Sequence, residues 1–97
     1  MMNDIYQQLI DRAKSYPEVQ KVLLFGSRAY GDNDPRSDID LAVIAPDITQ
    51  SDWLKFSTDI ENVDTLLKID LIKWENASDE LKNEIRACHR ELYHMVT

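Results

Sequence analysis

The sequence predicts a small α/β domain in which a three-stranded mixed sheet packs with helices. Apolar residues recur at steps of three and four in three segments, which is the spacing of amphipathic helices. Three short apolar segments that are rich in β-forming residues lie between them. The chain has 97 residues, so we expect a single domain over residues 1–97.

The first half of the chain predicts one helix and two strands. Asn3 can cap the helix, and Pro17 ends it. Its apolar positions are Ile5, Leu9, Ile10, Ala13 and Tyr16. A buried strand is expected over 19–25, and a second strand over 39–45 ends at Pro46.

The second half predicts a helix, a strand and a final helix. Ser51 can cap the first of these helices. Its apolar positions are Trp53, Phe56, Ile60 and Val63. The segment 67–74 is expected to be the third strand, and Asn76 or Ser78 opens the last helix. The apolar positions of that helix are Leu81, Ile85, Cys88, Leu92 and Met95, which form a stripe for core packing or for docking.

Composition narrows the classes of function. The formal net charge is −7 and the pI is about 4.6, so an extended nucleic-acid partner is disfavoured. Cys88 is the single cysteine, which excludes an internal disulfide and favours a reducing compartment. We see no signal peptide and no apolar stretch that could span a bilayer, so we expect a cytoplasmic protein without a membrane partner.

A glycine–serine pair follows the first predicted strand. Gly26 lacks a Cβ, so its backbone can approach a ligand closely. Ser27 offers a hydroxyl and a backbone N–H at the start of a predicted helical turn, where phosphate oxygens bind favourably. Gly31 allows the chain to turn back toward the second strand.

Two carboxylates stand at the head of that second strand. Asp38 and Asp40 are two residues apart, so their side chains point to the same face, with Cα atoms about 6.5–7 Å apart. Without a cation they would repel each other. Carboxylate oxygens are the ligands that Mg²⁺ prefers, and a bound cation is the simplest reason for the pair.

The pattern Gly26-Ser27, Gly31 and Asp38-Ile39-Asp40 resembles the signature of the DNA polymerase β-type nucleotidyltransferases. In particular it is similar to the minimal nucleotidyltransferases, the small halves of two-component systems. The resemblance implies the polymerase β-like nucleotidyltransferase fold. It extends to the order of helices and strands along nearly the whole chain.

The resemblance also implies roles for individual residues. Asp38 and Asp40 would be catalytic ligands of two Mg²⁺ ions, and Asp70, on the third strand, would complete the metal site and serve as general base. The alternative for Asp70 is an aspartate on an edge strand that faces water. Gly26 and Ser27 would hold the β- and γ-phosphates of a nucleoside triphosphate, ATP by preference.

Two further residues are candidates for the nucleotide site. Ser37 would orient the carboxylates or touch phosphate, and its alternative role is to cap a turn. Arg28 would neutralise triphosphate charge, and its alternative is an ordinary surface arginine.

Resemblance implies the partner as well. Larger relatives carry a helical domain that shapes an acceptor pocket, whereas little of this chain follows its last predicted strand. We therefore expect a small helical protein of the HEPN type to supply an acceptor tyrosine, with this chain as its antitoxin. Two alternatives stay open: an antitoxin that neutralises by binding alone, and a homodimeric transferase for small molecules such as aminoglycosides.

Four other residues attract attention but carry little functional weight. His89 and His94 are five apart on one predicted helix and would diverge, which disfavours a metal pair. Trp74 is expected to be a packing anchor, and Tyr30 an accessory contact at most.

Overall fold

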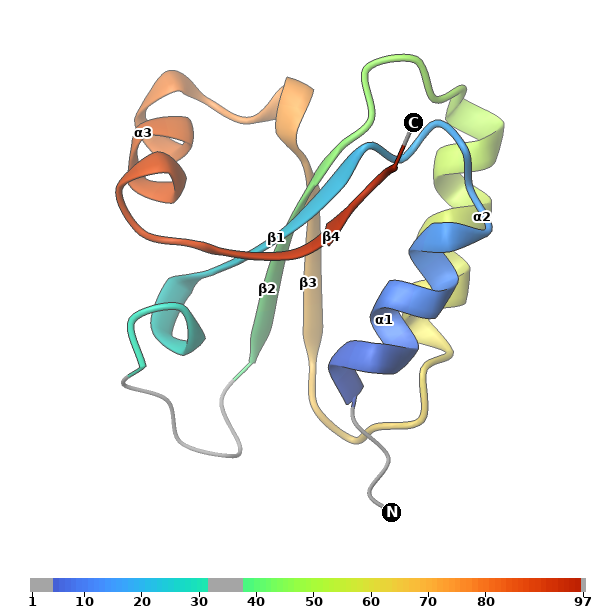
Figure 1. Cartoon of the computed structure of the whole chain (residues 1–97), viewed down its shortest axis with the longest axis horizontal. Coiled ribbons are helices and arrows are strands. Elements are labelled where there is room, and N and C mark those ends of the chain that lie inside the picture. Colours follow the sequence, from blue (N-terminus) through green and yellow to red (C-terminus); the bar gives the residue numbers. More distant parts are fainter. Residues whose placement is uncertain (1–4, 32–37, 97) are drawn as a thin grey trace.

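The computed structural model describes residues 5–31 and 38–96 of the chain. Its elements in chain order are α1 (Ile5–Lys14), β1 (Lys21–Phe25), η1 (Gly26–Arg28), β2 (Ile39–Ile44), α2 (Gln50–Glu61), β3 (Ile69–Lys73), η2 (Trp74–Asn76), α3 (Asp79–Ala87) and β4 (Arg90–His94). Helices α1 and α2 cover one face of the sheet, and α3 lies on the other face (Figure 1).

The sheet is mixed, as predicted, but it has four strands rather than three. The strand order is β3-β2-β1-β4. Strand β2 pairs with β1 in antiparallel and with β3 in parallel orientation, and β4 pairs with β1 in antiparallel orientation. Strands β3 and β4 are therefore the two edges, and β1 and β2 are central.

The fourth strand replaces the second half of the predicted last helix. Helix α3 ends at Ala87, and Cys88 adopts an extended backbone at φ −154° and ψ 113°. Residues 90–94 then pair with β1, and Met95 N donates to Gln20 O at 2.8 Å. The apolar stripe is thus divided between two elements, and the prediction of a single helix over residues 81–95 was wrong.

Helix boundaries follow capping side chains. Thr49, not the predicted Ser51, caps α2 by accepting from Asp52 N at 3.1 Å. Ser78 caps α3 by accepting from Leu81 N at 3.1 Å, which confirms one of the two predicted caps. The predicted cap at Asn3 lies outside the described residues.

Alternation along the strands divides the core into two layers. One side of the sheet packs against α1 and α2 and holds the larger cluster, which includes Phe56. The opposite side holds a smaller cluster beneath α3, in which Leu23, Ala42 and Ile85 are buried. The smaller cluster leaves that face less completely covered, since its other apolar members are only partly buried.

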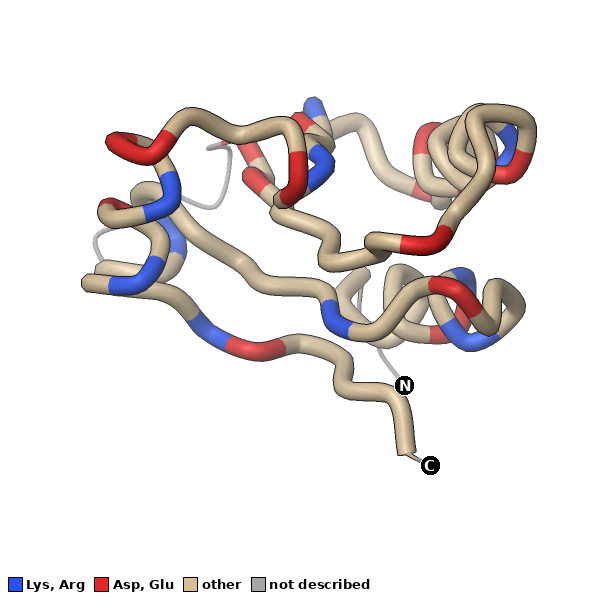
Figure 2. The backbone as a smooth tube through the Cα atoms, turned by 90° about the horizontal axis from the view of Figure 1, so that it is seen from above, with Lys and Arg blue, Asp and Glu red and all other residues tan. Residues whose placement is uncertain are grey.

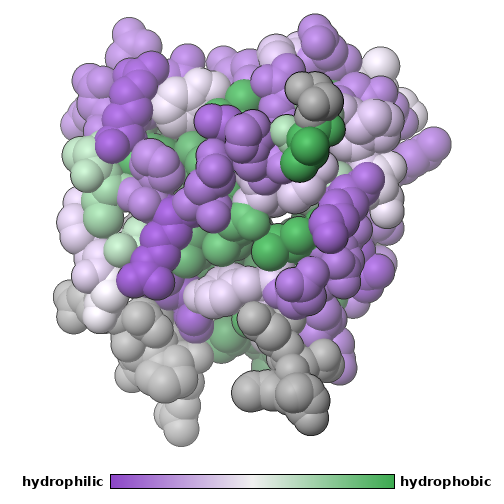
Figure 3. Space-filling model, in the orientation of Figure 1, coloured by the Kyte–Doolittle hydropathy of each residue, from purple (hydrophilic) through white to green (hydrophobic). Residues whose placement is uncertain are grey.

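The surface is polar and mixed in charge. Lys and Arg are interspersed with Asp and Glu along the backbone (Figure 2). In the view of Figure 3, apolar surface shows through in the middle of the molecule and polar side chains surround it. No helix within residues 5–31 and 38–96 has the length and apolarity needed to cross a membrane.

Candidate active site

Two of the predicted carboxylates face each other across neighbouring strands. Asp40 of β2 and Asp70 of β3 are directly paired in the parallel register. Both share a face of the sheet with Ala42, which packs toward α3. Asp38 immediately precedes β2 and has the same parity, although its side chain is exposed. The structure therefore makes Asp40 and Asp70 direct neighbours across two strands, with Asp38 on the same side at the start of β2.

Gly26 lies directly against the carboxylate of Asp40. It follows β1 at the point where Phe25 pairs with Asp40, and its φ of +76° favours glycine. A Cβ at this position would overlap Oδ2 of Asp40 and lie 3.3 Å from Cγ. The glycine is thus required twice, by its backbone conformation and by the carboxylate next to it.

The cluster is electrostatically unfavourable for a charged Asp40. Partial burial raises the pKa of the Asp40 carboxyl, and the negative charges of Asp70 and Asp38 raise it further. A hydrogen bond shared with Asp70 acts in the same direction. A bound cation would reverse the effect, because it favours the charged carboxylates.

Lys68 supplies a positive charge that the sequence reasoning missed. Its Nζ lies 3.6 Å from Oδ1 of Asp70, and it lowers the pKa of Asp40 against the other influences. The sequence could have indicated this position, because Lys68 is two residues before Asp70 and side chains two apart on a strand face the same way.

The phosphate-binding candidates lie on η1, beside the carboxylates. The predicted helical turn is present, and Ser27 is exposed on it. The turn is held by Ala29 N and Tyr30 N, which both donate to Gly26 O. Ser27 is therefore available to a ligand, while Ser37 falls outside the described residues.

Arg28 does not occupy an ordinary surface position. It is buried, with 9% of its surface exposed, and its Nη1 donates to the hydroxyl of Tyr6 on α1 at 3.0 Å. The surface alternative was wrong, because this bond ties η1 to α1. A contact between Arg28 and a triphosphate stays a prediction.

The donor set fits a hard divalent cation. Carboxylate oxygens are the ligands that such ions prefer, and Asp40 and Asp70 are direct neighbours on paired strands. Among residues 5–31 and 38–96, no three His, Cys, Asp or Glu side chains converge closely enough to hold an ion by themselves. Waters would supply the remaining ligands, and phosphate oxygens would replace some of them when a nucleotide binds, as in the Mg²⁺ sites of phosphate-transferring enzymes.

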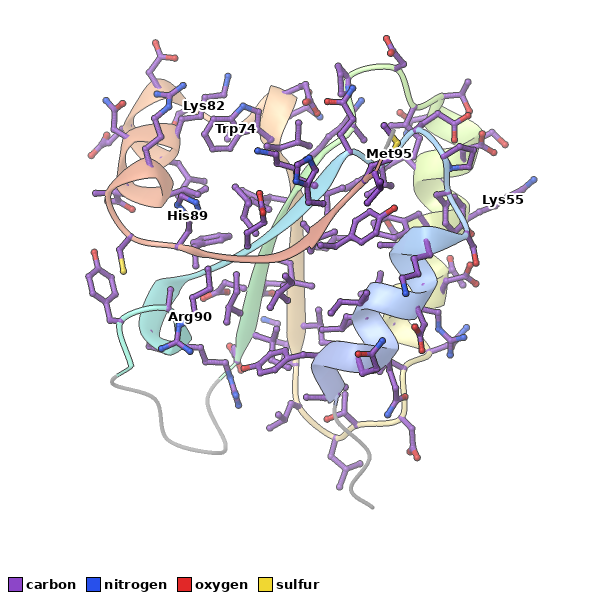
Figure 4. The ribbon with its side chains drawn as sticks, viewed as in Figure 1. Lys55, Trp74, Lys82, His89, Arg90 and Met95 are labelled. Carbon is purple, nitrogen blue, oxygen red and sulfur yellow. The ribbon has the colours of Figure 1, made fainter. Side chains whose placement is uncertain are left out.

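Trp74 and the two histidines lie outside β2 and β3, the strands of the carboxylate cluster. Trp74 of η2 lies beside Lys82 of α3 (Figure 4). Lys82 Nζ lies 5.6 Å and Arg86 Cζ 5.2 Å from the centroid of the Trp74 ring. The predicted anchoring role is therefore confirmed. His94 belongs to β4, and His89 precedes that strand, so the two histidines do not share a helix as predicted.

Comparisons with known proteins identify the family and the fold. The sequence matches the family described as Polymerase beta, Nucleotidyltransferase over residues 7–95. No curated protein sequence matches the chain.

Solved structures share the fold. A chain of a toxin–antitoxin complex with AMP-PNP is 25% identical, with a TM-score of 0.73 over 93% of this chain and 73% of that one. A chain from a complex of the tri-AMPylated HEPN toxin of Shewanella oneidensis with its MNT antitoxin is 22% identical, with a TM-score of 0.67 over 94% and 71%. Because the family match spans nearly the whole sequence, this chain belongs to the polymerase beta nucleotidyltransferase family.

Proposed function

We propose that this nucleotidyltransferase moves AMP from ATP onto a tyrosine hydroxyl of a small helical HEPN-type partner, and so acts as an antitoxin in the cytoplasm. The observation that carries the proposal is the pairing of Asp40 with Asp70 across β2 and β3, beside the Cβ-free backbone of Gly26. The similar chains in toxin–antitoxin complexes, one with AMP-PNP and one with a tri-AMPylated toxin, support the choice of nucleotide and partner.

The donor half is assigned to η1 and the carboxylates. Gly26 and Ser27 bind the β- and γ-phosphates through backbone N–H groups and the serine hydroxyl. Asp38, Asp40 and Asp70 would hold two Mg²⁺ ions, which neutralise phosphate charge and lower the pKa of the attacking hydroxyl. Arg28, fixed to Tyr6, keeps η1 in place and adds positive charge nearby.

The order of strands supports one direction of attack. The phosphate-binding turn follows β1, Asp40 lies on β2, and Asp70 lies on the edge strand β3. Displacement at phosphorus is in line, so the acceptor approaches from the side opposite the leaving pyrophosphate. The acceptor oxygen therefore arrives over β3, which is an edge strand of the sheet in the described part of the chain.

The transfer takes place in a single displacement at the α-phosphorus. The acceptor hydroxyl gives its proton to Asp70, and its oxygen forms a bond to the α-phosphorus. The bond between the α-phosphorus and the bridging oxygen breaks, and pyrophosphate leaves with that electron pair. Asp70 later releases the proton to water.

The decisive experiment uses ATP labelled at the α- or the γ-phosphorus. The chain is incubated with Mg²⁺ and an HEPN-type helical protein that co-purifies with it, and the proteins are then separated by mass. Label should transfer from the α-position only, and Asp38→Asn should abolish transfer. Asp47→Asn is the matched control, because Asp47 is exposed beyond the far end of β2.

The alternatives give different results in the same experiment. If the Asp38→Asn variant still neutralises the partner but transfers no nucleotide to it, the chain is an antitoxin that acts by binding alone. A nucleotide-sized mass increase on an aminoglycoside, with none on protein, would identify a transferase for small molecules.

A further inference from the structure

Lys68 forms an ion pair with one member of the carboxylate cluster. Its Nζ lies 3.6 Å from Oδ1 of Asp70, with 70% of its side chain and 43% of that of Asp70 exposed. Among the charges of described residues that act on Asp40, Lys68 is the one that opposes the effect of Asp38 and Asp70. In the cation-free protein, Lys68 thus occupies a position where positive charge is needed.

The backbone of Lys68 is fixed while its side chain can move. Its carbonyl oxygen accepts from Ile39 N at 2.9 Å, which joins the start of β3 to the start of β2. The side chain projects into solvent beside a groove of about 290 Å³. The groove is lined by Glu61, Thr65, Leu67, Lys68 and Ile69.

The groove offers the ammonium a second place to lie. Glu61, at the end of α2, is exposed and contributes a carboxylate to the same groove. Glu61 is therefore an alternative carboxylate for the ammonium group on the wall of the same groove. An exposed ion pair of this kind is weak enough to exchange.

We propose that Lys68 is an exchangeable counter-cation, which pairs with Asp70 in the cation-free protein and is displaced toward the groove when a divalent cation binds. This inference rests on the proposed function, since it assumes that the three carboxylates bind a divalent cation. Lys68 is then a positioning residue that tunes cation affinity. It keeps Asp70 in place before the cation arrives and weakens binding of a cation without nucleotide.

The test measures Mn²⁺ binding by electron paramagnetic resonance without nucleotide, so that transfer activity is not needed. Lys68→Gln removes the charge, and Lys68→Arg retains it. Lys55→Gln is the matched control, because Lys55 is an exposed lysine that extends away from α2 (Figure 4) and gives the same change in net charge. Repulsion between an ammonium group and a dication a few ångströms apart, screened by water and salt, predicts that Lys68→Gln binds Mn²⁺ about three- to tenfold more tightly.

The outcomes separate this inference from the proposed function. Tighter binding in Lys68→Gln, with wild-type affinity in Lys68→Arg and Lys55→Gln, supports the exchange. Unchanged or weaker binding in Lys68→Gln overturns it and leaves the proposed function standing. A free-Mn²⁺ signal that the wild type does not reduce, even at millimolar concentrations, overturns both. Circular dichroism of each variant shows that its fold is retained.

Discussion

Replacement of Gly26 by alanine tests how the turn and the carboxylate depend on each other. Gly26 has a φ of +76°, a conformation that costs an L-residue about 1–2 kcal/mol. For a domain of this size each kcal/mol lowers Tm by about 4–8 °C, so we expect a loss of about 4–16 °C. The added Cβ would also overlap Oδ2 of Asp40 and force that carboxylate to rotate.

The second effect has its own readout. A rotated Asp40 no longer holds a cation together with Asp70, so Mn²⁺ affinity should fall by about 10–100-fold, the range seen when the shell around a metal site is disturbed. Thermal melting in EDTA measures the first effect, and Mn²⁺ titration followed by electron paramagnetic resonance measures the second.

Gly31 offers a matched control. Its φ is +77°, almost the same as that of Gly26, but a Cβ there meets no atom of the described residues within 4 Å. Gly31→Ala should therefore lower Tm by a similar amount and leave cation affinity unchanged. If both variants lose cation affinity equally, the contact between Gly26 and Asp40 is not what shapes the site.

Three other predictions concern charge and packing. In EDTA, the free energy of unfolding of the wild type should fall as pH rises from 3.8 through the raised pKa of Asp40, because the folded carboxyl holds its proton more tightly than the unfolded one. Asp40→Asn should reduce this dependence of stability on pH, measured by denaturant unfolding from pH 4 to 8. Tyr16→Phe removes a hydrogen bond to Asp59 but keeps the ring on Phe56, so we expect a loss of about 1 kcal/mol by urea denaturation. The same bond raises the pKa of Tyr16 to about 12, so the wild type should lose this advantage between pH 10 and 12, whereas the variant has none to lose. Ile85→Ala empties the one fully buried position of α3 and should cost about 2–5 kcal/mol; a loss below 1 kcal/mol would show that α3 is not held by this contact.

Local spacing was sufficient to predict where the residues assigned to the donor half lie. Gly26 and Ser27 follow a strand directly, and Asp38 and Asp40 share a face because strand side chains alternate. The pairing of Asp40 with Asp70 joins strands thirty residues apart, and such register is not visible in a local pattern. It was available only through the resemblance to a family.

The fourth strand was missed because its apolar residues continued the helical stripe of α3. No glycine or proline interrupts the chain between Ala87 and Met95, so nothing local marks the end of the helix. The signal lay in β1, where Val22, Leu23 and Leu24 are all buried. A strand that is apolar on both faces is typical of a sheet interior, so a second neighbour for β1 could have been expected.

The position of the carboxylates lowers the stability of the cation-free fold. Asp40 shares its sheet face with the buried Ala42, so its charge is only partly solvated, and Asp38 and Asp70 add repulsion. An acidic cluster of this kind weakens the cation-free fold at neutral pH, which a purely structural role would not require. A ligand that binds only the folded state stabilises it, so divalent cations should raise Tm of the wild type. Asp40→Asn should instead be as stable as the wild type in EDTA, or more stable, and gain little from the cation. A stable variant that no longer responds to cations is the expected signature of residues placed for chemistry rather than for folding.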